Sequence, residues 1–61
     1  MMWHFYYKIF ERNNPTVGML KNMTQAGMNF TDALNKFYST VKKDLDDGVY
    51  DFKLTNYEKE E

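Results

Sequence analysis

The sequence has no cysteine, one proline and a single histidine in 61 residues. Without cysteine, neither a disulfide nor a thiolate-bound metal can stabilise the fold. His4 alone cannot form an imidazole-rich metal site, so we expect no metal and no cofactor. Because a chain of this length buries only about 60% of the surface that its unfolded form exposes, we expect association with another protein or with itself to add stability.

A strong excess of either charge is also missing. Eight basic and nine acidic side chains leave a formal net charge of −1. Domains that bind nucleic acids usually carry a basic excess, so this balance disfavours that class. No apolar run is long enough to span a membrane, and the first residues lack the positive region and the small-residue cleavage site of a signal peptide. With the absence of cysteine, these features predict a cytoplasmic protein.

Aromatic residues are abundant, and the first strand that we predict, residues 2–12, is rich in them. Its odd positions Trp3, Phe5, Tyr7 and Ile9 form the more apolar face, which we assign to the core. The even face mixes aromatic and basic side chains, a composition typical of protein interfaces, so this face or an edge of the strand is predicted to bind a partner. The predicted partner-binding residues are His4, Tyr6, Lys8, Phe10, Arg12 and Lys53.

The next two segments predict helices. Residues 15–26 are interpreted as a first helix, with Asn14 as its N-cap and Pro15 at its first position. Gly27 is expected to close this helix in the left-handed conformation. Residues 29–48 are interpreted as a second helix, because their apolar residues recur at intervals of three and four. That apolar stripe consists of Phe30, Ala33, Leu34, Phe37, Tyr38, Val41 and Leu45.

Residues 49–57 alternate in polarity and predict the last strand, and residues 58–61 are expected to form a charged C-terminal tail. The sequence therefore predicts one α+β domain, residues 1–57, in the order strand, helix, helix, strand. In this fold an antiparallel two-stranded sheet packs on a helical hairpin. Two free sheet edges would remain, and a dimer that joins edges would build a four-stranded sheet.

Two other motifs are weaker interpretations of the same residues. The helical hairpin resembles a helix-turn-helix with Gly27 in its turn, but Asn22 and Lys36 stand where that motif prefers apolar residues. Residues 44–48 resemble the start of a calcium-binding loop. They lack the third acid at its required spacing, and Thr55 stands where the loop needs glutamate.

The sequence contains no pattern that indicates catalysis or a small-molecule substrate, since His4 has no sequence partner for a catalytic triad. We therefore expect a small non-enzymatic regulator, adaptor or inhibitor that binds a larger protein or itself. Its size and style are those of small viral and mobile-element products, which is an analogy. The alternative is a nucleic-acid-binding module that uses the helical hairpin or stacks bases on the aromatic strand face.

Overall fold

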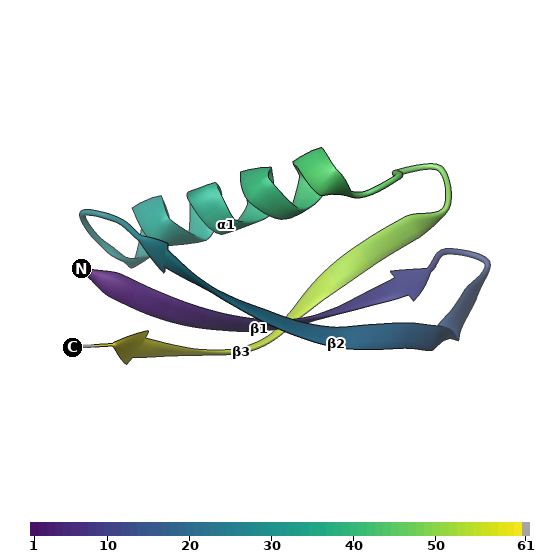
Figure 1. The fold of residues 1–61 in the computed structure, drawn as a ribbon, viewed down its shortest axis with the longest axis horizontal. Helices are drawn as coiled ribbons and strands as arrows, with labels where there is room; N and C mark the ends of the chain where they lie inside the picture. The colour runs from purple at the N-terminus through teal and green to yellow at the C-terminus, as the bar shows by residue number, and fades with distance from the viewer. Residues whose placement is uncertain (61) are drawn as a thin grey trace.

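The computed structural model describes residues 1–60. Four elements follow one another: β1 (Met2–Glu11), β2 (Asn14–Ala26), α1 (Phe30–Asp44) and β3 (Tyr50–Glu60). The strands form one antiparallel sheet in the order β2-β1-β3. The helix lies along one face of this sheet (Figure 1), so the described chain has two layers and one sheet face without a helix.

The α+β class and the antiparallel pairing of the first and last strands are confirmed, but the helical hairpin is wrong. The segment predicted as a first helix is β2, which pairs with β1 along most of its length. Val17, Met19 and Met23 fit the two-residue period of a strand as well as helical spacing. Gly18 is a poor helix former, and β-branched residues such as Val17 favour strands. Hydrogen bonding to β1 decides between the two structures.

Gly27 has a different role from the one expected. No glycine in residues 1–60 has a positive φ, so Gly27 does not close a helix in the left-handed conformation. It is buried at the end of β2, and a Cβ atom there would lie 2.6 Å from the backbone nitrogen of Ala33. Its lack of a side chain therefore allows the chain to pass close against the first turn of α1.

The core lies between α1 and β1, as the alternation of the first strand and the stripe of the second helix predicted. Phe37 stacks on Phe5, with ring centroids 4.8 Å apart, and meets Tyr7 edge to face at 5.1 Å. Such aromatic pairs add to the hydrophobic stabilisation of the core. The buried cluster consists of Trp3, Phe5, Tyr7, Ala33, Phe37 and Val41.

The start of α1 follows the prediction, whereas its end comes earlier. Asn29 caps the helix through its side-chain oxygen, which accepts a hydrogen bond from the backbone N–H of Asp32 at 2.9 Å. The Asp32 carboxylate accepts one in turn from the backbone N–H of Met28 at 3.0 Å. The helix ends at Asp44 instead of continuing to Gly48. The aspartates between these two residues would have met the negative end of the helix dipole, which is unfavourable.

Asp32 makes the stability of this cap dependent on pH. The hydrogen bond from Met28, followed by the contact with Lys36, lowers the pKa of Asp32 below the ordinary value of an aspartate. A lowered pKa in the folded state contributes stability above the unfolded pKa, and this stability is lost as pH falls through the folded pKa. We predict that Asp32→Ala lowers Tm at neutral pH and that the difference from the wild type shrinks below about pH 4. Thermal melts across this range check it; a constant difference would contradict it.

A β-bulge in β3 sets which of its side chains face the helix. Tyr6 pairs with Asn56 and Tyr7 with Leu54, which leaves Thr55 as the extra residue. Beyond the bulge, Tyr57 reaches Phe30 of α1, with ring centroids 4.7 Å apart. β3 continues to Glu60, and the backbone of residues 58–60 pairs with β1. These residues therefore belong to the sheet and not to a tail. Glu61 lies outside the described residues.

Candidate protein-interaction surface

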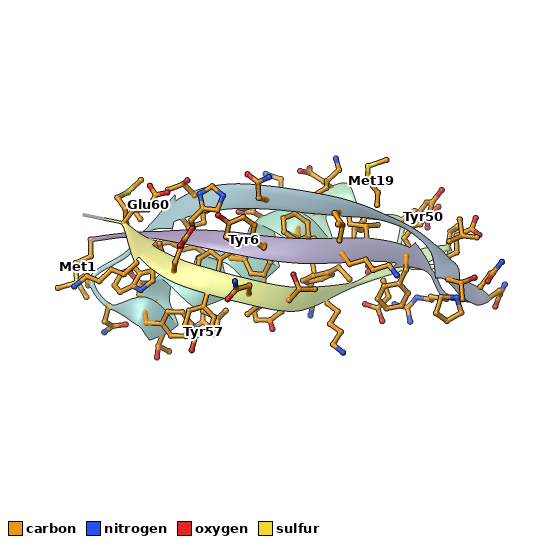
Figure 2. The ribbon with its side chains drawn as sticks, turned by 90° about the horizontal axis from the view of Figure 1, so that it is seen from below. Met1, Tyr6, Met19, Tyr50, Tyr57 and Glu60 are labelled. Carbon is orange, nitrogen blue, oxygen red and sulfur yellow. The ribbon has the colours of Figure 1, made fainter. Side chains whose placement is uncertain are left out.

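The sheet face that points away from α1 is the candidate site, and we call it the open face. Figure 2 shows this face with Tyr6 near its centre. Residues that lie opposite each other on neighbouring strands project to the same side, so the register defines its members. The open face consists of Met2, His4, Tyr6, Lys8 and Phe10 of β1, Gly18, Leu20, Asn22, Thr24 and Ala26 of β2, and Asp51, Lys53, Asn56, Glu58 and Glu60 of β3.

Five of the six residues predicted to bind a partner lie on the open face, and Arg12 lies just past the end of β1. The backbone N–H of Arg12 donates to the carbonyl of Val49 at 2.9 Å. Its guanidinium lies 3.8 Å from the carboxylate of Asp51, at the margin of the open face. The role of these six residues in binding remains a prediction. The alternative, binding of a partner at an edge of β1, is wrong, because β2 and β3 occupy both edges of that strand.

The contribution of β2 to this face was not predicted. Leu20 is the most exposed apolar side chain of the open face, at 78%. It lies opposite Lys8, between the polar end of the face and Phe10. The contribution of β2 was missed because residues 15–26 were interpreted as a helix. The two-residue period of Val17 and Met19 was nevertheless a signal of a strand.

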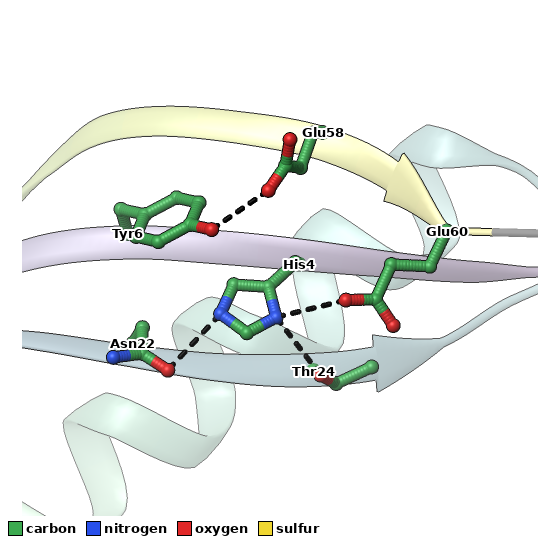
Figure 3. A network of polar contacts seen from close by, with 6 residues as sticks. All are labelled: His4, Tyr6, Asn22, Thr24, Glu58 and Glu60. Atoms are coloured by element: carbon green, nitrogen blue, oxygen red, sulfur yellow. Dashed lines mark hydrogen bonds and ion pairs between the residues drawn. The ribbon is translucent and has the colours of Figure 1, made fainter.

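A polar network joins all three strands at one end of the open face (Figure 3). The Nε2 atom of His4 lies within hydrogen-bond distance of the side-chain oxygen of Asn22, at 3.0 Å. Its Nδ1 atom lies 3.1 Å from a carboxylate oxygen of Glu60 and 3.2 Å from the hydroxyl of Thr24. The imidazole therefore has polar partners at both nitrogens and is held in one orientation.

Tyr6 belongs to the same end of the face. Its hydroxyl donates to a carboxylate oxygen of Glu58 at 2.7 Å, and its ring lies 4.6 Å from the ring of His4. This hydrogen bond raises the pKa of Tyr6, with smaller contributions from burial and from the charges of Glu58 and Glu60. The phenol is therefore a neutral, oriented and partly buried group on the open face.

Two lysines lie toward the other end of the open face, next to Asp51, which pairs with Arg12 at the margin. Lys8 of β1 lies directly opposite Lys53 of β3. Like charges in this position are unfavourable for a sheet, and neither lysine makes an ion pair within residues 1–60. Glu58 and Glu60 lie at the opposite end, so the face carries both signs of charge, with the lysine pair in one half and two acids in the other.

Comparison with protein-family models, with curated proteins and with solved structures finds no match. Among residues 1–60, no helix is long and apolar enough to cross a membrane. The described part of the chain also has no group of three histidine, aspartate or glutamate side chains that could hold a metal ion.

Proposed function

We propose that this chain is a small non-enzymatic protein-interaction module that binds a larger protein, or a second copy of itself, through the open face. One observation carries the proposal: α1 covers one face of the sheet and leaves Tyr6, Phe10 and the exposed Leu20 on the other. Apolar side chains grouped on a surface that is otherwise polar mark contact sites in many proteins.

The lysine pair supports the same proposal. Lys8 and Lys53 repel each other in the free protein, and a carboxylate supplied by a partner between them would remove that repulsion. The acids at the other end, Glu58 and Glu60, would accept basic groups in the same way. A partner that carries both signs of charge therefore fits the face better than a uniformly charged one.

This charge pattern also weighs against the alternative, binding of single-stranded nucleic acid by the aromatic side chains. Glu58 and Glu60 would repel phosphates along half of the face, and the hydroxyl of Tyr6 is already engaged. A gel-shift titration against salt separates the two functions. Steep salt-dependent retardation of an oligonucleotide indicates the alternative, and the absence of any shift agrees with a protein-binding module.

The proposed role is that of a regulator, adaptor or inhibitor in the cytoplasm. The absence of cysteine agrees with a reducing compartment. An origin in a virus or a mobile element remains an analogy from size alone. No cofactor, catalytic group or small-molecule substrate is part of this proposal.

Leu20→Ser is expected to weaken the association at least about tenfold, because burying a leucine side chain contributes about 1.5–3 kcal/mol. The matched control is Met28→Ser. Met28 is 82% exposed, against 78% for Leu20, but it lies in the connection between β2 and α1, outside the open face. Because both residues are exposed, neither substitution should lower Tm by more than a few degrees.

Sedimentation equilibrium on the wild type and both variants measures self-association. Affinity capture with the same three proteins, followed by quantitative mass spectrometry, measures binding of another protein. The proposal expects one of these signals to fall for Leu20→Ser and to persist for Met28→Ser. If the association persists unchanged in Leu20→Ser, the open face is not the interaction surface.

A further inference from the structure

A second uncovered surface lies on the helix side of the sheet, as a groove of about 570 Å³ between the C-terminal end of α1 and β2. Ile9 of β1 and Val17 and Met19 of β2 line its floor, and Val41 and Leu45 line the wall at the end of the helix. Met19 is 59% exposed and extends from the outer edge of β2 (Figure 2). The groove is therefore an apolar surface that the helix leaves open.

The groove borders a free sheet edge. β2 is an edge strand of 13 residues, and no strand within residues 1–60 pairs with its outer side. Its unpaired N–H and C=O groups form a template for another strand. Only Pro15, near its start, and Lys21 oppose such pairing. Alternate side chains of a strand added here would point to the helix side of the sheet, toward the groove.

The charges at the groove select the kind of segment that fits. Three carboxylates, those of Glu11, Asp44 and Asp46, line it against one ammonium group, that of Lys21. None of these acids makes an ion pair within the described residues. The C-terminal end of α1 adds a partial negative charge at the same place. Burial and then the charge of Asp44 raise the pKa of Tyr7, which also lines the groove.

We propose that the groove binds an extended segment of another protein, which adds as a strand to the outer edge of β2. Its alternate apolar side chains would contact Val17, Met19 and Leu45, and a lysine or arginine side chain would meet the carboxylates of Glu11 and Asp44. The backbone of β2 supplies affinity, and the groove and its charge supply specificity. Of the residues that line the groove, only Phe10 and Gly18 also belong to the open face, so the proposal does not depend on the function proposed above.

Peptide display on the intact chain tests this proposal. A random library of peptides of about ten residues is panned in parallel on the wild type and on Met19→Lys, which places a positive charge in the groove. Met19 is exposed, so this variant should keep the fold. The wild type is expected to enrich peptides with alternating apolar residues and at least one lysine or arginine, and Met19→Lys is not.

Titration calorimetry with a selected peptide then separates the contributions. We expect about tenfold or greater losses of affinity for Met19→Lys, for Asp44→Asn, and for a peptide N-methylated at alternate residues. Leu20→Ser, on the open face, should bind the peptide normally. The absence of enrichment over Met19→Lys, binding indifferent to N-methylation, or a wild-type dimer dissociated by Met19→Lys would each overturn the proposal. The last result would make a second copy the occupant.

Discussion

Phe37→Ala is expected to destabilise the protein by about 3–5 kcal/mol, the usual cost of removing a buried phenylalanine. The Phe37 ring is fully buried at the centre of the core. It contacts Phe5 and Tyr7 of β1 and Phe52 of β3, so its removal leaves a cavity between the helix and two strands. Domains of this size rarely have more than about 3–5 kcal/mol of stability from their core, so the variant should be largely unfolded.

Urea denaturation and thermal melts followed by circular dichroism measure this effect. Tyr38→Ala is the matched control on the same helix, because Tyr38 is 38% exposed and covers only the margin of the core. Its loss should cost clearly less than that of Phe37. A cooperative melt of Phe37→Ala within a few degrees of the wild type would show that this helix face is not the core.

Gly27→Ala is expected to have the second-largest effect, and Gly27→Val a larger one. A Cβ atom at position 27 would lie 2.6 Å from the backbone nitrogen of Ala33 and 3.1 Å from its Cβ. The closest of these contacts is with the backbone at the first turn of α1, which cannot change conformation as easily as a flexible side chain. The helix must therefore move away from the sheet. Overpacking of this kind costs about 1–3 kcal/mol.

Gly48→Ala is the control for this substitution. A Cβ atom at Gly48 would meet only a carboxylate oxygen of Asp46, at 3.4 Å, which is an ordinary contact. Denaturation curves of the two variants should therefore differ, with Gly27→Ala much the less stable. Equal stabilities would mean that Gly27 is not packed against α1.

The sequence predicted β1 and α1 well because each has one dominant period. Trp3 and Phe5 alternate with polar neighbours, and the stripe around Phe37 has helical spacing, with Asn29 before it as a cap. These local signals agree with the tertiary contacts, so no long-range information was needed. They also placed the even side chains of β1 together on one face, which is the part of the candidate site that could be predicted.

β2 could not be predicted in the same way, because the proline at its start and the glycine after its end each fit two different structures. Pro15 fits the first turn of a helix and equally the start of an edge strand. Gly27 fits a helix terminus and equally a close approach of two backbones. Pairing with β1 decides between these structures, and it is a contact between distant residues. The contributions of Leu20 and Asn22 to the open face depend on that pairing and were missed with it.

Site-specific photo-crosslinking tests the central claim, that the open face is the interaction surface, most directly. Benzoylphenylalanine replaces Leu20 on the open face in one protein and Lys42, exposed on α1, in another, in cells that naturally make the protein. The account predicts a crosslinked product of defined mass, with a second copy or another protein, from position 20 and none from position 42. A product from position 42 alone, or none from position 20, would contradict it.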